Sequence, residues 1–218
     1  MGRGKAGIER AILLDPFDAR PHNYYSRYFI ALGRFPESLA ESNRALELDP
    51  ANPILTGFLV FHYLCARDFS QAVAAAKRSL ELDPANQTAL VNLRWTYEQM
   101  GLLEKAAEVW QKAQADKIEL RRALEAEGPK GYWRALLNWQ LTQRTISGYH
   151  TSIVYARLGE PDKAFEWLER AYRDRNPWLP NLNADPAFDT IRADPRFVAL
   201  VKKVGLPTTP SPPPGGKP

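Results

Sequence analysis

Residue types that could support metal binding or nucleophilic chemistry are few in this sequence and widely spaced. His62 and Cys65 lie three residues apart, a spacing that places two potential metal ligands on one face of a helix. The other histidines, His22 and His150, lie far from this pair along the chain. We therefore expect no metal site, and we interpret His62 as a residue at the edge of a helix.

The carboxylates and glycines also lack the spacing of a catalytic or phosphate-binding site. Glu166 and Glu169 have the spacing of a solvated helix face, without the paired burial that turns a carboxyl group into an acid catalyst. The stretch 2–5 lacks the glycine spacing of a phosphate-binding loop and the Ser or Thr after its Lys. No Gly-x-Ser-x-Gly nucleophile motif occurs. We predict no catalytic residue, no cofactor and no enzymatic activity.

The composition is that of an ordinary globular protein, with 44% hydrophobic and 25% charged residues among 218. The net charge is +4, and interleaving of basic with acidic residues argues against nucleic acid as a direct partner. Cys65 is the only cysteine, which excludes an internal disulfide and fits a reducing compartment. The most apolar stretch, 54–66, is too short to span a membrane, and no signal peptide is recognisable. We expect a soluble cytoplasmic protein without a membrane partner.

A tripeptide that recurs at a fixed step indicates which helices carry the residues discussed above. Leu-Asp-Pro stands at 14–16, 48–50 and 82–84, at steps of 34 residues. This period is typical of a repeated helix-turn-helix unit. Because Pro disfavours helical backbone at the residue before it, each Asp-Pro pair is expected to end the second helix of a unit.

Positions inside each unit agree with pairs of antiparallel helices. The expected turn between the two helices of a pair carries Gly33, Arg67 and Gly101, and glycine suits a helix that ends in left-handed backbone. Small residues such as Ser38 and Ala72 stand where the two helices of a pair should cross closely. The pattern predicts three such units in succession.

The pattern is then interrupted and returns. The second helix of the third unit is expected to run on to Gly128-Pro129, and a further helix is expected from Gly131 to about Arg144. Tyr155 and Gly159 stand at the corresponding positions of a fourth unit. The chain should therefore contain an inserted helical segment before its last unit.

Two Asp-Pro pairs after the fourth unit predict short helices that cap the stack, because Asp185 and Asp194 each stand where an N-cap residue precedes Pro in the first turn. The predicted fold class is all-α, a solenoid of antiparallel helix pairs with C-terminal capping helices. The expected organisation is a half repeat with the second helix only (1–16), three units (17–118), an inserted helical segment (119–144), a fourth unit (145–178), capping helices (179–206) and a disordered Pro-rich tail (207–218).

The C-terminal region resembles a group of bacterial tetratricopeptide-repeat proteins. Their closing segment is similar to residues 181–207, NLNADPAFDTIRADPRFVALVKKVGLP, of which DPRF is the most specific part. The preceding YARLGEPDKAFEWLERAYRDRNPW is similar to the last repeat of that group. There the repeats usually follow an effector domain, which is a winged-helix transcription activator, a class III adenylate cyclase or a Ser/Thr kinase. None is visible here, so the resemblance implies a tetratricopeptide superhelix in a regulatory or scaffolding setting.

In tetratricopeptide proteins the first helices of the pairs line a concave groove, and the resemblance implies which residues face it. We expect a non-catalytic scaffold that binds a peptide or helix of an unidentified protein there, with aromatic and Arg side chains as anchors. Some proteins of this class hold a C-terminal carboxylate with a set of Lys, Asn and Arg residues, from which this sequence departs at Asn23, Arg27 and Phe61. The predicted partner-binding residues are Asn23, Arg27, Ile30, Phe61, Leu64, Val91, Trp95, Glu98, Tyr149 and Ile153.

Other interpretations stay open. The inserted segment or the C-terminal helices could cover Phe61 and Trp95, so that the chain fills its own groove. The half repeat at the start leaves an apolar face uncovered and could support a homodimer. The chain could also be a sensory or regulatory module severed from an N-terminal effector domain.

Overall fold

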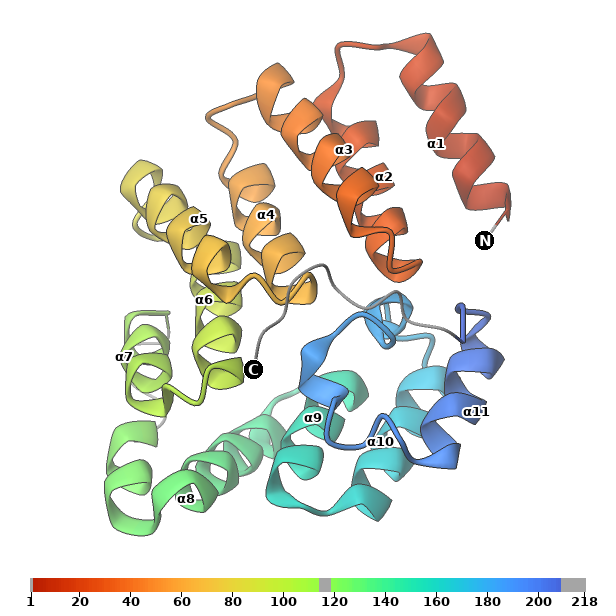
Figure 1. The fold of residues 1–218 in the computed structure, drawn as a ribbon. Coiled ribbons are helices and arrows are strands. Elements are labelled where there is room, and N and C mark those ends of the chain that lie inside the picture. Colours follow the sequence, from red (N-terminus) through yellow and green to blue (C-terminus); the bar gives the residue numbers. More distant parts are fainter. Residues whose placement is uncertain (1, 114–118, 209–218) are drawn as a thin grey trace. The chain divides into compact units, whose positions relative to one another are not determined.

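Regular structure in the described part of the chain is entirely helical. The structure is a computed structural model and describes residues 2–113 and 119–208. Successive helices pack against one another, as in stacked helical repeats. The eleven α-helices in these ranges are α1 (Gly2–Leu14), α2 (Ala19–Ala31), α3 (Phe35–Leu48), α4 (Pro53–Cys65), α5 (Phe69–Leu82), α6 (Gln87–Gln99), α7 (Leu103–Ala113), α8 (Leu120–Thr142), α9 (Gly148–Leu158), α10 (Pro161–Arg173) and α11 (Pro195–Val204), and the 3-10 helices are η1 (Leu179–Asn181) and η2 (Pro186–Phe188) (Figure 1).

The described residues fall into two compact units, one up to Thr96 and the other from Tyr97 to Thr208. The helix α6 contributes to both. Two sequence-based expectations concern residues outside the described ranges, namely the continuation of a helix through 114–118 and the tail from 209 onward.

The turns between paired helices have the left-handed backbone that the sequence predicts. Gly33 and Gly101 have φ angles of 70° and 72°, and Arg67 at the equivalent place between α4 and α5 has a φ angle of 59°. A side chain with a Cβ is disfavoured in this conformation by roughly 1–2 kcal/mol. Glycine avoids that cost at two of the three turns, whereas Arg67 bears it.

The Leu-Asp-Pro tripeptides end helices as expected. The helix α3 ends at Leu48, and the amide of Asp49 donates a last hydrogen bond of 3.0 Å to the carbonyl of Ala45. The helix α5 ends in the same way at the next tripeptide. After a short turn α4 begins, and its first amides are capped by the side chain of Asn52, which accepts from the amide of Ile54.

The first helices α4 and α6 approach closely at Gly57. A Cβ at this position would lie 2.9 Å from the Cβ of Thr88 and 3.2 Å from the amide nitrogen of Ala89. The buried side chain of Asn92 on α6 donates a hydrogen bond of 2.9 Å to the carbonyl oxygen of Gly57. The missing side chain therefore sets the spacing of two helices that carry predicted binding residues.

A buried chain of hydroxyl groups joins α2, α3 and α4. The Oγ of Ser26 lies 2.6 Å from that of Ser42 and 3.1 Å from that of Ser38, and the Oγ of Ser38 lies 2.8 Å from Nδ1 of His62. His62 is 2% exposed, so its expected place at a helix edge is wrong, because its imidazole packs against the preceding helix α3 through Ser38. Burial lowers the pKa of His62 to about 4, which keeps the imidazole neutral near pH 7.

In residues 97–208 the core forms where α7, α8 and α9 meet. The ring of Trp110 on α7 packs edge-on against Trp139 on α8, with ring centroids 4.8 Å apart. The backbone of α8 is not helical at Gly128, whose φ is 65°, so two helices meet there before Pro129, as the sequence predicts. The buried members of this core are Leu103, Ala106, Ala107, Trp110, Leu120, Tyr132, Trp133, Leu136, Leu137 and Val154.

The closing segment, residues 174–208, follows α10 and is held by capping aspartates and buried rings. Asp185 begins η2 and Asp194 begins α11, and each side chain accepts a hydrogen bond from the amide two residues later, as the Asp-Pro pattern predicts. The rings of Phe188 and Phe197 are buried, with centroids 6.0 Å apart. These contacts give the closing segment an apolar core of its own.

Candidate peptide-binding surface

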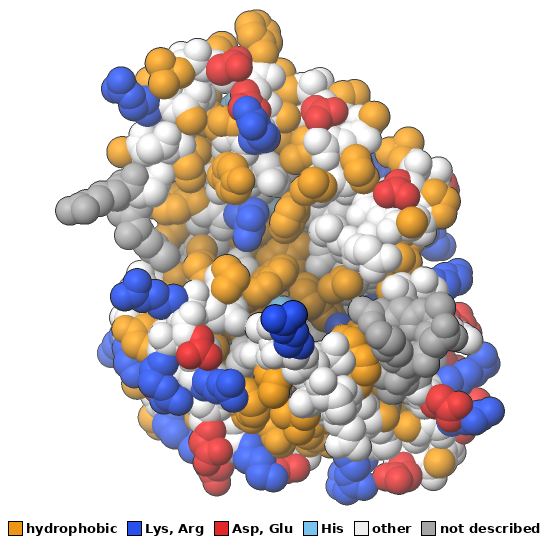
Figure 2. Space-filling view, turned by 180° about the vertical axis from the view of Figure 1, so that it is seen from behind, with side chains coloured by type: hydrophobic (Ala, Val, Ile, Leu, Met, Phe, Trp, Pro, Cys, Tyr) orange, Lys and Arg blue, Asp and Glu red, His pale blue; other side chains and the backbone are white. Residues whose placement is uncertain are grey.

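Side chains at helical spacing on α2, α4 and α6 form one candidate surface within residues 1–96. Residues three or four positions apart on a helix lie on the same side of it. Figure 2 shows hydrophobic side chains gathered over this part of the chain, in the upper half of the view. We name this surface the first-helix face and assign to it Asn23, Arg27, Ile54, Phe58, Phe61, Val91 and Trp95.

The pair of Arg27 and Phe58 connects α2 to α4 on this face. The guanidinium carbon of Arg27 lies 4.9 Å from the centre of the Phe58 ring, and both side chains are half-buried. Burial lowers the pKa of Arg27, although a guanidinium stays charged at any physiological pH. Asn23 is half-buried one turn earlier on α2. The α2 end of the face is therefore polar and cationic.

The pair of Phe61 and Trp95 connects α4 to α6. Their ring centroids are 6.3 Å apart and the rings meet edge to face, at 65°. Phe61 is 2% exposed, whereas Trp95 and Val91 are half-buried. Phe61 therefore supports the indole of Trp95 rather than offering a surface of its own.

Within residues 1–96, two of the predicted binding residues belong to the core. Ile30 on α2 and Leu64 on α4 are each 2% exposed. Transfer by repeat position assigned them to the groove, whereas the structure buries both side chains. Asn23, Arg27, Val91 and Trp95 are the predicted residues that keep part of their surface accessible in this unit.

The predicted residue Glu98 lies in the other unit and binds the inserted helix. The hydroxyl of Tyr132 on α8 donates a hydrogen bond of 2.6 Å to the carboxylate of Glu98, and both side chains are buried. Next to it, the guanidinium of Arg157 on α9 donates to the side-chain oxygen of Gln99. Of the predicted groove residues, Glu98 is therefore covered by the chain's own inserted helix.

The predicted residue Tyr149 on α9 lies under the closing segment. Its hydroxyl donates a hydrogen bond of 2.9 Å to Asp185, and its ring packs edge-on against Phe188, with centroids 5.2 Å apart. Ile153, one turn later on α9, is half-buried. In residues 97–208 the first helix α9 is thus contacted by the chain's own C-terminal residues.

Phe58 was missed by the sequence reasoning, which transferred only certain repeat positions. It precedes Phe61 by three residues on α4, a spacing that by itself places both rings on one side of the helix. That spacing was the signal that could have identified it.

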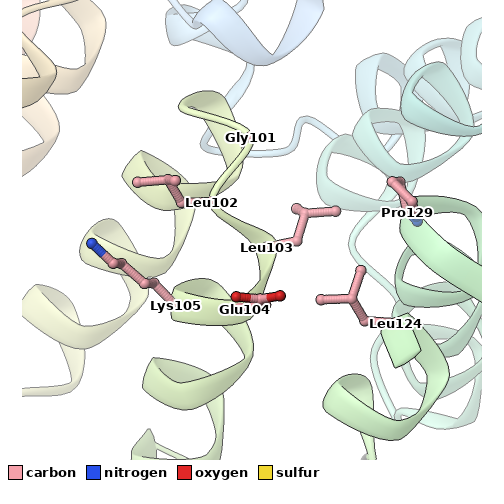
Figure 3. A pocket seen from close by; sticks show the side chains of 7 residues that line it. All are labelled: Gly101, Leu102, Leu103, Glu104, Lys105, Leu124 and Pro129. Atoms are coloured by element: carbon pink, nitrogen blue, oxygen red, sulfur yellow. The ribbon is translucent and has the colours of Figure 1, made fainter.

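A separate hollow of about 420 Å³ lies in residues 97–208, where α7 begins beside the bend of α8. Figure 3 shows Leu103 directed toward Leu124 and Pro129, whereas Leu102 and Lys105 point to the other side of the turn. It contains none of the predicted binding residues. The described ranges also contain no cluster of three His, Cys, Asp or Glu side chains suited to a metal ion.

None of the helices within residues 2–113 and 119–208 is long and apolar enough to cross a lipid bilayer. No protein-family model matches the sequence, and no curated protein is significantly similar to it.

Proposed function

We propose that this chain is a tetratricopeptide-type scaffold that binds a peptide or a helix of another protein on the first-helix face. The 34-residue step of Leu-Asp-Pro, the left-handed turns and the sequential packing of helices support this repeat type. The proposed role is one of recognition and assembly, without a catalytic step.

The observation that carries the proposal is the row of half-buried side chains across three first helices. Arg27, Phe58 and Trp95 each contact a residue of an adjacent helix and keep part of their surface accessible. Aromatic and Arg side chains that are fixed in this way before a partner arrives lose little conformational freedom on binding. The row therefore suits a surface whose binding energy is concentrated in a few anchors.

The proposal can be tested by selecting binders from a displayed library of random 12-residue peptides with the purified full chain. The affinity of a selected peptide is then measured by fluorescence anisotropy for wild type and for Trp95→Ala. Loss of a central aromatic anchor should weaken binding about 30-fold or more. Circular dichroism melts establish that the variant is folded.

Trp167→Ala is the matched control, because Trp167 is a half-buried tryptophan on the second helix α10. The guanidinium carbon of Arg170 lies over its ring, 4.8 Å from the ring centre. The control should bind the selected peptide as wild type does. Equal affinities for wild type and Trp95→Ala would contradict the proposed surface.

Self-association is a second candidate function, which a patch at α1 favours. Leu13, Leu14 and Phe17 are 82%, 74% and 77% exposed. Clustered apolar side chains of this size are typical of surfaces that another protein covers. A second copy of the chain would cover the patch by presenting the same residues across a two-fold axis.

Sedimentation velocity at micromolar concentration tests this second candidate. A dimer of wild type that becomes a monomer in the Leu13→Ser, Phe17→Ser variant would support it. A wild type that is monomeric throughout the concentration range would contradict it.

A further inference from the structure

We propose that the partner segment carries an Asp or Glu side chain whose carboxylate binds Arg27, beside an apolar side chain that packs on Phe58 and Trp95. This inference rests on the proposed function and names the chemistry of the partner. It follows from the geometry of Arg27 and from the distribution of charge over the helices of residues 1–96.

The first step concerns the contacts that the Arg27 guanidinium makes within the protein. The guanidinium carbon of Arg27 lies over the Phe58 ring, 4.9 Å from the ring centre. A phenyl ring has no oxygen or nitrogen acceptor, so this contact satisfies none of the five N–H donors of the guanidinium with an ordinary hydrogen bond. Among the described residues, none accepts a hydrogen bond from this group or forms an ion pair with it.

The second step concerns charge. Neither α2 nor α4 contains an Asp or Glu residue, and α6 has none before Glu98. Nearby acidic residues bind other groups, and Glu41 of α3, for example, binds His22 at 2.6 Å. The other arginine of α2, Arg20, is held by Asp18 at 2.7 Å. Arg27 is thus the cation of the first-helix face for which an anion is missing.

The third step concerns the cost of burial. A half-buried charge loses part of its hydration, and this loss lowers the pKa of Arg27. A ring face offsets only a part of the lost hydration, whereas a carboxylate at the edge adds two charge-assisted hydrogen bonds. The site is therefore better matched to an anionic group than to an apolar one.

The fourth step distinguishes a side-chain carboxylate from the C-terminus of a peptide. Asn23 lies one helical turn before Arg27 on α2, and Phe58 contacts Arg27 from α4. The face therefore continues past the guanidinium along α2 and across to α4. A bound segment that contacts both Asn23 and Phe58 has residues before and after the one that meets Arg27, which favours a side-chain carboxylate over a chain end.

The test uses four pools of fluorescent 12-residue peptides with Leu and Phe randomised around a fixed central residue. Three pools are acetylated and amidated, with Glu, Gln or Lys at the centre, and the fourth has Gln and a free C-terminus. Wild type should bind the Glu pool about tenfold more tightly than the Gln pool, and the Lys pool more weakly still. Arg27→Gln should bind the Glu and Gln pools equally, whereas Arg27→Lys should keep a reduced preference for Glu.

Arg44→Gln is the matched control, because it removes the same charge from an exposed position on α3. It should keep the wild-type preference. An unchanged preference for Glu in Arg27→Gln, or a wild type that binds the Glu and Gln pools equally, would overturn this inference while leaving peptide binding intact. Tighter binding of the free C-terminus than of the Glu pool would also overturn it. If no pool binds to wild type, the proposed function itself fails and this inference fails with it.

Discussion

The hydroxyl of Tyr149 on α9 donates a hydrogen bond of 2.9 Å to the carboxylate of Asp185, which also begins η2 by accepting from the amide of Ala187. Both side chains are buried, and burial raises the pKa of Asp185. The Tyr149 hydroxyl thus joins the last helix pair to the closing segment and offsets part of the lost hydration of the buried Asp185 carboxylate.

Replacing Tyr149 by Phe is predicted to destabilise residues 97–208. The change leaves a buried carboxylate oxygen without its donor, at a cost of about 1–3 kcal/mol. Urea unfolding measures the free energy, and hydrogen exchange should show faster opening of η2 and α11. Tyr24→Phe, at a position that is 57% exposed, should change stability little. A Tyr149→Phe protein as stable as the Tyr24 control would contradict the structural role assigned to this bond.

Gly57→Ala is predicted to destabilise residues 1–96 because the added methyl group would meet Thr88 at 2.9 Å and the backbone of Ala89 at 3.2 Å. Overpacking of this kind costs roughly 1–3 kcal/mol. Gly7→Ala on α1 is the control, since no atom lies within 4 Å of its added Cβ. That change should instead stabilise the helix by up to about 1 kcal/mol. Thermal denaturation measures the stability of both variants. A Gly57→Ala protein as stable as wild type would be inconsistent with the close approach of α4 and α6.

At Arg67, glycine is predicted to be more stable than alanine. The backbone there has a φ angle of 59°, a conformation that costs a residue with a Cβ roughly 1 kcal/mol relative to glycine. Comparing Arg67→Gly with Arg67→Ala isolates the backbone term, because both variants lack the arginine side chain. The difference between their unfolding free energies is the measurement. An alanine variant at least as stable as the glycine variant would show that this turn is not strained.

The buried imidazole of His62 predicts a loss of stability in mild acid. Its folded pKa of about 4 lies below the unfolded value of 6.5, so the unfolded chain binds the proton more readily between these values. The stabilising contribution is complete above pH 6.5 and falls as the pH drops toward 4, by about 2 kcal/mol between pH 7 and 4.5.

The measurement for His62 is the change in unfolding free energy between pH 7 and 4.5, compared with that of His62→Asn. The amide keeps a polar partner for Ser38 without titrating in this range. The variant should be less stable at pH 7 but should lose less on acidification, while other groups titrate alike in both proteins. Equal losses in the two proteins would show that His62 does not carry the acid sensitivity.

Helices and their ends could be predicted from the sequence because they depend on local signals. Gly33 and Gly101 indicated left-handed turns, and Gly128-Pro129 indicated the break in α8, since each feature is decided by the backbone preferences of one or two residues. The capping role of Asp185 was visible for the same reason.

The contacts that decide the candidate surface were less predictable because they depend on distant segments. Repeat position placed Tyr149 and Glu98 in a groove, but it gave no information about which later segment would contact them. The partners, Asp185 and Tyr132, lie more than thirty positions away in each case. The edge position assigned to His62 was wrong for the same reason, since the hydroxyl of Ser38 that accommodates the imidazole comes from another helix.

The central claim, that a peptide binds on the first-helix face, is tested most directly by photo-cross-linking. A selected peptide with benzoylphenylalanine at single positions is irradiated with the full chain, and the linked residues are identified by mass spectrometry. Cross-links confined to α2, α4 and the part of α6 up to Thr96, and lost on competition with unlabelled peptide, are the predicted result. Specific cross-links on the second helices α3 and α5, or only within residues 97–208, would contradict the claim.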